Sequence, residues 1–138
     1  MTDTLRFGDE LELRVEKLIA GGDGFARHQG RPVFIPRSAP GDLVRVRVTE
    51  VKRDYLRGEV AEILEAGPSR REPPCPHFAD CGGCDLQHLD DTAQVELKAA
   101  AVRETLRRLG GVELPEPLAI HAAEPFGYRL RTGVRIEP

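Results

Sequence analysis

All three cysteines of the chain lie close together, in the stretch CPHFADCGGCDLQH. Thiolates at this distance along a glycine-containing loop are suited to holding one metal centre, because glycine lets the backbone approach the sulfur atoms. Iron–sulfur clusters take cysteine ligands, normally four, whereas tetrahedral zinc also accepts three cysteines with one histidine, for which His77 and His88 are available. The residues alone leave both metals open. The spacing is C-x5-C-x2-C, formed by Cys75, Cys81 and Cys84.

Other uses of these cysteines fit the sequence less well. A Cys-x2-Cys redox pair usually opens a helix within a βαβ unit, and no such pattern surrounds Cys81 and Cys84. Buried structural thiols would need apolar neighbours, whereas Pro, His and Asp stand around these. No stretch has the pattern of a membrane span or a signal peptide, so we expect a cytoplasmic protein with no membrane partner and with reduced thiols. A metal site is the favoured interpretation.

Positive charge gathers in one part of a chain whose net charge is −3. Between Arg27 and Arg57 there are eight basic residues and only three acidic ones, while residues 58–138 hold nine basic and fourteen acidic residues. A basic module beside an acidic remainder suggests a face that binds a polyanion such as nucleic acid. Scattered charge on a solvated sheet explains the same numbers equally well, so charge alone does not decide.

The elements that would position these residues begin with a small barrel. Apolar residues alternate with charged ones in 11–20 and 43–51, and glycine- and proline-containing turns separate these stretches from two further short ones. Strands at this spacing, with no helix between them, predict a mainly β, OB-like barrel over residues 1–64. Residues 65–90 are expected to form a linker and the cysteine loop. The predicted strands cover residues 11–20, 31–36, 43–51 and 55–64.

One helix is predicted for residues 90–111, opening the part of the chain from 91 to 138, which we expect to be the start of a truncated α+β domain. Asp90 or Asp91 can cap the beginning of this helix, and two glycines can end it. A further strand is expected from about residue 128, with no partner after it. No nucleophile has a neighbouring base, so no catalytic residue is predicted. The apolar stripe of the helix comprises Val95, Ala99, Val102, Leu106 and Leu109.

Several residues of the barrel are candidates for contact with nucleic acid. Arg45 and Arg47 alternate with valines and therefore share the outward side of one strand, where phosphates could reach them. Aromatic side chains could add base stacking, but in so small a barrel Phe25, Phe34 and Tyr55 are each more often core residues than stacking platforms. The candidate nucleic-acid contacts are Arg37, Arg45, Arg47, Lys52, Arg53 and Tyr55.

Two stretches resemble a known family. GGDGFARHQGRPVFIPRSAPGDLVRVRVTEVKRDYLRGEVAEIL resembles the TRAM domain, an OB-like barrel found on RNA-modifying enzymes. CPHFADCGGCDLQHL followed by a helix is similar to the iron–sulfur segment of TRAM-containing RNA (uracil-C5)-methyltransferases of the 23S ribosomal RNA type. The cysteine motif makes the resemblance specific, because other RNA-modifying enzymes also carry TRAM. Radical-SAM methylthiotransferases are among them, but their cluster motif is Cys-x3-Cys-x2-Cys.

The resemblance, which covers nearly the whole chain, implies an N-terminal fragment of such an enzyme. It implies a 4Fe–4S cluster with Cys75, Cys81 and Cys84 as three of four ligands, the fourth lying further along a longer chain. It also implies methyl transfer from S-adenosylmethionine to uridine C5 by a domain absent here, so we expect the fragment alone to be an inactive, monomeric binder of ribosomal RNA. The alternative is a stand-alone TRAM module that binds RNA and holds a zinc ion through three cysteines and one histidine.

Overall fold

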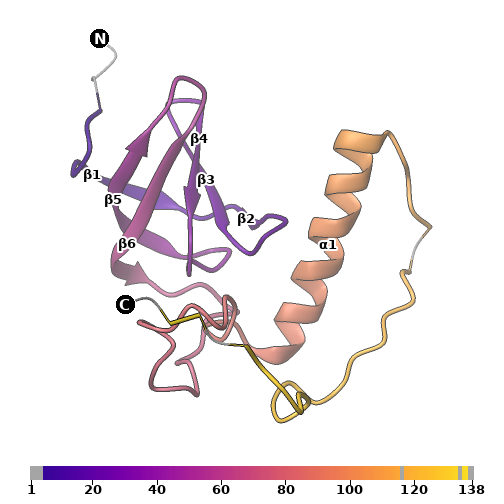
Figure 1. Cartoon of the computed structure of the whole chain (residues 1–138). Coiled ribbons are helices and arrows are strands. Elements are labelled where there is room, and N and C mark those ends of the chain that lie inside the picture. The colour runs from indigo at the N-terminus through magenta and orange to yellow at the C-terminus, as the bar shows by residue number, and fades with distance from the viewer. Residues whose placement is uncertain (1–4, 116, 134, 137–138) are drawn as a thin grey trace.

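The computed structural model describes residues 5–115, 117–133 and 135–136, and within these the chain forms six strands and one helix (Figure 1). Figure 1 shows the strands gathered in one group, α1 standing beside the β2 end of that group, and the segment between β6 and α1 running beneath it. The elements are β1 (Glu10–Arg14), β2 (Lys17–Leu18), β3 (Gly24–His28), β4 (Arg31–Ile35), β5 (Leu43–Val51), β6 (Leu56–Glu65) and α1 (Asp91–Gly110).

The strands lie in the order β1-β5-β6-β4-β3-β2. β1 and β2, which follow each other in the chain, are therefore the two edge strands of the sheet. β1 pairs with β5, and β2 pairs with β3. Between them the backbone changes partner: the N–H of Val15 donates to the Asp42 carbonyl at 2.9 Å, and the N–H of Glu16 donates to the Phe25 carbonyl at 2.8 Å. One bent run thus joins the two edges, which closes the sheet into the predicted barrel.

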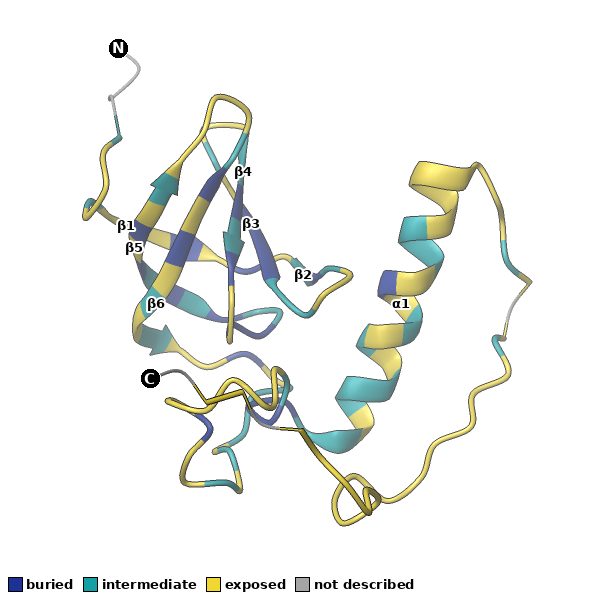
Figure 2. Cartoon of the chain, in the orientation of Figure 1, coloured by how far each residue is buried: buried dark blue, intermediate teal, exposed yellow. Residues whose placement is uncertain are grey.

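The core of the barrel follows from the alternation along its strands. In β5 the side chains of Val44, Val46 and Val48 are fully buried, whereas Arg45 is half-buried and Arg47 is exposed. Figure 2 shows buried positions alternating with more exposed ones along the strands. β5 and β6 shift register at several places, and such bulges bend a strand enough for a small barrel to close. The inner cluster is made of Leu13, Val15, Ala26, Val33, Ile35, Val44, Val46 and Leu56.

The helix α1 has the bounds that its capping residues predicted. Asp90 accepts a hydrogen bond from the N–H of Ala93 at 2.8 Å, and Gly111 ends the helix with a left-handed φ of 64°. The predicted apolar stripe is only partly right, because the side that faces the barrel carries Leu97, which packs on a second small core, and the buried Ala101. The stripe residues Val102, Leu106 and Leu109 remain 50%, 37% and 75% exposed.

Two further expectations differ from the structure. The stretch 11–20 is two strands instead of one, because the change of partner after Arg14 interrupts the pairing. The strand expected from about residue 128 does not form within 128–133 and 135–136, and its remaining residues lie outside the described part of the chain. An extended segment without a neighbouring strand has no partner for its backbone groups, which explains this result.

Candidate nucleic-acid interface and cysteine loop

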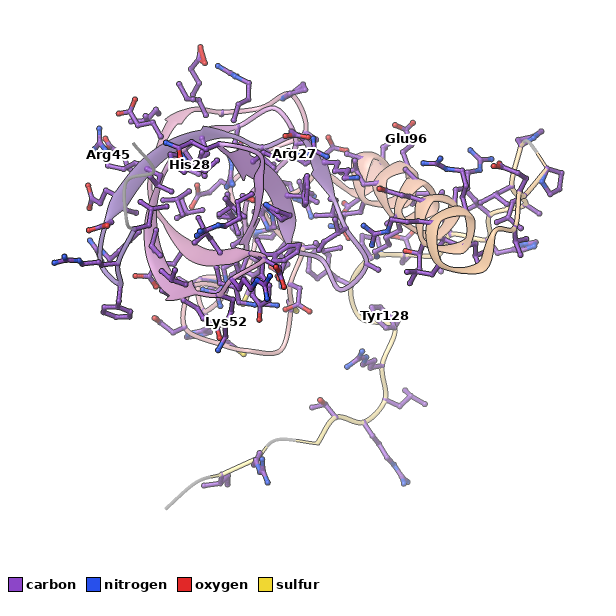
Figure 3. All side chains as sticks on the ribbon, turned by 90° about the horizontal axis from the view of Figure 1, so that it is seen from above. Arg27, His28, Arg45, Lys52, Glu96 and Tyr128 are labelled. Carbon is purple, nitrogen blue, oxygen red and sulfur yellow. The ribbon has the colours of Figure 1, made fainter. Side chains whose placement is uncertain are left out.

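The outward side of β5 carries Arg45 and Arg47 between two acidic strands. The Arg45 guanidinium lies 3.4 Å from Glu12 and also pairs with Glu62, and the Arg47 guanidinium lies 3.4 Å from Glu59. Figure 3 shows Arg45 on the side of the barrel away from α1. The two arginines share one side of β5 because side chains alternate along a strand, and pairing with β1 and β6 surrounds them with carboxylates. Their attraction for phosphate is partly compensated, and the sequence of β5 alone gave no sign of this.

The loop between β5 and β6 presents three of the predicted contacts. The N–H of Lys52 donates to the Tyr55 carbonyl at 3.0 Å, which closes the loop. A hydrogen bond to Glu50 raises the pKa of Lys52, so its ammonium stays charged. The side chain of Arg53 is 96% exposed, beside Asp54. The Tyr55 ring folds back onto the barrel, with its centroid 5.6 Å from that of Phe34.

This contact belongs to a row of side chains that crosses four strands on the outer surface. Cross-strand register places Lys17 of β2 opposite Phe25 of β3, Phe25 opposite Phe34 of β4, and Phe34 beside Arg57 of β6. The ring centroids of Phe25 and Phe34 lie 6.1 Å apart. We call Phe25, Phe34 and Tyr55 the aromatic row. The sequence favoured a core role for each of these aromatic residues taken singly. It could not show the row, because the three rings come together only when the strands pair.

Cations lie over the rings of the aromatic row. The Lys17 ammonium is 5.0 Å and the Arg27 guanidinium 5.1 Å from the Phe25 centroid, and the Arg57 guanidinium is 5.8 Å from the Phe34 centroid. Distances of this size are typical of cation–π contacts. Phe25 is buried beneath its two cations, whereas Phe34 and Tyr55 are half-buried. Each of these cations also pairs with a carboxylate, so this side of the barrel combines aromatic surface with paired charges. The pairs are Lys17 with Glu104, Arg27 with Glu16, and Arg57 with Asp23.

Arg37 joins the barrel to the cysteine loop. Its guanidinium lies 5.3 Å from the Phe78 ring centroid and donates a hydrogen bond to the Ala79 carbonyl, and both residues stand between Cys75 and Cys81. Its own carbonyl accepts a hydrogen bond of 2.9 Å from Arg70. Arg37, a candidate nucleic-acid contact, thus holds the cysteine loop against the barrel.

A buried carboxylate organises the same junction. Asp42 is fully buried and accepts hydrogen bonds from the backbone N–H groups of Ala39 and Gly67, each 2.7 Å long, and from the Arg70 guanidinium at 2.7 Å. Burial alone would raise the pKa of Asp42, but these hydrogen bonds outweigh it and hold the pKa below its ordinary value of 3.8. The Asp42–Arg70 pair therefore fixes the linker after β6 to the barrel.

His88 packs at this junction and faces the barrel. Its Nε2 lies 3.1 Å from the Ser38 carbonyl, and its ring centroid lies 5.7 Å from that of Phe78. Burial lowers the pKa of His88, so the ring is neutral and its Nε2–H donates to the carbonyl. His77, the other histidine proposed for zinc, is exposed. Within the described part of the chain, neither histidine joins the cysteines in a group of three or more potential metal ligands.

The three cysteines lie on an open loop. Cys81 and Cys84 are exposed, and Cys75 is half-buried with its N–H donating to the Gln87 side chain at 3.1 Å. The Gly83 N–H points at the Cys81 sulfur at 3.4 Å. The donor chemistry suits a metal, but among the described residues no three candidate donors come together as a metal site. As positioned, the thiols do not fit a cluster, and the loop would have to close to hold one.

A groove of about 870 Å³ lies between the barrel, the cysteine loop and α1. Its walls include Gly22 of the β2–β3 turn, Cys84 and Leu86 of the loop, and Leu106 of the helix. Val102 and Leu106 of the predicted apolar stripe of α1 therefore line this groove. Within the described part of the chain, no helix is both long enough and apolar enough to cross a membrane.

The comparison with known families defines the barrel. Residues 6–61 match the TRAM domain, which is almost the whole of the closed sheet. Residues 6–61 of this chain therefore form a TRAM domain, which a loop of three cysteines and a helix follow.

Its sequence relatives include proteins named as RNA methyltransferases. It is 39% identical over 128 residues to an uncharacterized RNA methyltransferase of Aquifex aeolicus, covering 92% of this chain and 30% of that protein. It is 43% identical over 103 residues to the 23S rRNA (uracil(1939)-C(5))-methyltransferase RlmD of Shewanella amazonensis, covering 75% of this chain and 23% of that protein. The chain thus spans less than a third of the length of these curated relatives.

A solved structure is also similar to this chain. It is the tRNA (uracil-54, C5)-methyltransferase of Pyrococcus abyssi in complex with S-adenosyl-L-homocysteine, with 33% sequence identity and a TM-score of 0.44, and the match covers 77% of this chain and 24% of that one.

Proposed function

We propose that this chain is the N-terminal, RNA-binding and iron–sulfur portion of an S-adenosylmethionine-dependent 23S rRNA uridine-C5 methyltransferase. The observation that supports this most is the extent of the sequence match, which covers 92% of the chain and so includes the barrel, the cysteine loop and the helix together. A match to TRAM alone would stop near residue 61. The protein would work as a monomer in the cytoplasm, where ribosomal RNA is its partner.

The barrel would bind RNA chiefly by charge and shape. We propose contacts from the exposed Lys52 and Arg53 of the β5–β6 loop and from the half-buried Tyr55 beside them. Arg45 and Arg47 would contribute less because carboxylates surround them. Phosphate contacts of this kind give affinity without sequence preference. Arg37 would act mainly by holding the cysteine loop in place.

The methyl transfer itself would take place in a domain outside this chain. In the proposed reaction a cysteine thiolate would add to C6 of a flipped-out uridine, and C5 would take the methyl group from S-adenosylmethionine, which leaves as S-adenosylhomocysteine. A base would then remove the C5 proton while the bond between C6 and the sulfur breaks, which restores the C5–C6 double bond and frees the thiolate. No residue described here is proposed for those steps. The chain alone should accordingly bind RNA and show no methyltransferase activity.

Binding experiments on this chain test the RNA proposal. Fluorescence anisotropy with labelled ribosomal RNA fragments should show binding, and the double variant Lys52→Ala/Arg53→Ala should weaken it about tenfold, as expected for the loss of two phosphate contacts at low salt. Arg45→Ala/Arg47→Ala should weaken it less. The matched control is Arg107→Ala/Arg108→Ala in the last turn of α1, away from the barrel surface. Equal affinity of all variants would remove the β5–β6 loop from the interface.

The cysteine loop would hold a 4Fe–4S cluster through Cys75, Cys81 and Cys84, completed by a fourth ligand from a longer chain. The spacing of the thiols and their exposure in a glycine-containing loop support this role. Because the cluster is expected to need that fourth ligand, the test uses the complete protein. Anaerobic reconstitution should bind about four irons and absorb broadly near 400 nm. A colourless protein with one zinc would favour the stand-alone zinc module instead.

A further inference from the structure

The aromatic row lies on the outside of the barrel, not in its core. In β3 and β4 the neighbours of its phenylalanines, Ala26 and Val33, are fully buried and belong to the inner cluster. Since side chains alternate along a strand, Phe25 and Phe34 must point the other way. Phe25 is buried beneath Lys17 and Arg27, whereas Phe34, which carries Arg57 over its ring, and Tyr55 are only half-buried. Phe34 and Tyr55 are therefore the rings that keep surface for a ligand.

The composition of this surface selects a class of partner. A phenylalanine and a tyrosine lie 5.6 Å apart, and the Arg57 guanidinium lies over the first ring. Arg57 is held there by Asp23 at 3.2 Å on one side and Glu50 at 3.9 Å on the other. Aromatic rings and fixed guanidinium planes are the groups on which unpaired nucleobases stack, while neighbouring cations contact the phosphates.

Base pairing would block this mode of binding. In a duplex both faces of each base are covered by adjacent bases, so a side chain can reach a face only where the strand is unpaired. The exposed Arg53 and the charged Lys52 stand at the same end of the row, on the loop that carries Tyr55. Stacking and phosphate contacts are therefore available together for one extended strand.

We propose that Phe34 and Tyr55 stack unpaired bases, so that the barrel selects single-stranded RNA over duplex RNA. This inference rests on the proposed function, since it names the form of RNA that the barrel recognises. Phe25 and Arg57 act as positioning residues that hold the Phe34 ring in place. Two stacking rings suit one or two bases next to a phosphate bound by the β5–β6 loop.

The first test compares RNA forms and variants by fluorescence anisotropy. The probes are a short labelled single strand and the same strand annealed to its complement. The single strand should bind about tenfold more tightly, and Tyr55→Leu and Phe34→Leu should each weaken its binding by about five- to twentyfold while leaving duplex binding within about twofold. Tyr55→Phe should retain affinity because stacking needs the ring alone. The matched control is Phe7→Leu, a 78% exposed ring before β1.

A second measurement keeps the proposal testable if Phe34→Leu fails to fold. The chain has no tryptophan and two tyrosines, so in a Tyr128→Phe protein the tyrosine emission comes from Tyr55 alone. Stacking should quench this emission as single-stranded RNA is added. Equal affinity for both RNA forms, or full binding by Tyr55→Leu without quenching in the reporter protein, would overturn the inference and leave RNA binding intact. Failure of every RNA form to bind would instead defeat the proposed function.

Discussion

Removing Arg70 should destabilise the protein more than removing any one of the surface arginines of the barrel. Asp42 is fully buried, and Arg70 supplies three of its hydrogen bonds, two from Nε at 3.0 and 3.1 Å and one from Nη2 at 2.7 Å. In Arg70→Met the carboxylate keeps only the two backbone N–H donors. Breaking a buried ion pair typically costs 3–5 kcal/mol, and because the Arg70 side chain is 15% exposed we expect about 3 kcal/mol.

Urea unfolding followed by circular dichroism measures this effect. With a denaturant slope of about 2 kcal/mol per molar, the midpoint should fall by about 1.5 M. The matched control is Arg47→Met, whose ion pairs are about half exposed, so that its midpoint should move by less than about 0.5 M. Adding Asp42→Asn to Arg70→Met should recover part of the loss, since the unpaired charge is removed.

The reasoning would be refuted if Arg70→Met and Arg47→Met unfolded at the same urea concentration. It would also fail if Asp42→Asn added a further full loss in the Arg70→Met background, because the two residues would then act independently.

Three other predictions concern stability. The folded protein holds the pKa of Asp42 below its ordinary value of 3.8. The stability that this carboxylate provides is therefore fully present above pH 3.8 and is lost as the pH falls through the lower pKa of the folded state. Urea midpoints below pH 4 should accordingly drop more steeply in the wild type than in Asp42→Asn. Gly67→Ala should lower the thermal midpoint clearly, because its new Cβ would lie 2.3 Å from the Pro40 carbonyl oxygen, whereas Gly82→Ala meets no atom within 4 Å and should leave the midpoint nearly unchanged. Asp90→Ala removes the N-cap of α1 and should cost about 1 kcal/mol in urea unfolding, and Asp90→Asn should keep most of that stability.

The sequence predicted those elements whose alternation is regular. β5 (Leu43–Val51) was placed correctly because valines and arginines alternate from Val44 to Val48. β3 was missed, because Gly24, Phe25 and Ala26 are all buried and give no alternating pattern. The helix was placed well because Asp90 and Gly111 both act as caps.

The candidate site was predictable only in part, because its decisive features come from pairing between distant strands. Residues such as Lys17 and Arg57 are far apart in the chain, and only the register of four strands brings them into one row with Phe25 and Phe34. The carboxylates around Arg45 likewise come from β1 and β6. The cysteine spacing was visible at once, whereas the position of Arg37 over Phe78 required the folded loop.

The salt dependence of RNA binding by this chain tests the central claim most directly. If the barrel binds RNA through phosphate contacts and stacked bases, the logarithm of the affinity for a labelled single strand should fall linearly with the logarithm of the salt concentration, with a slope of about −2 to −3 for three or four contacts. Absence of binding at low salt, or an affinity that salt does not change, would contradict the account.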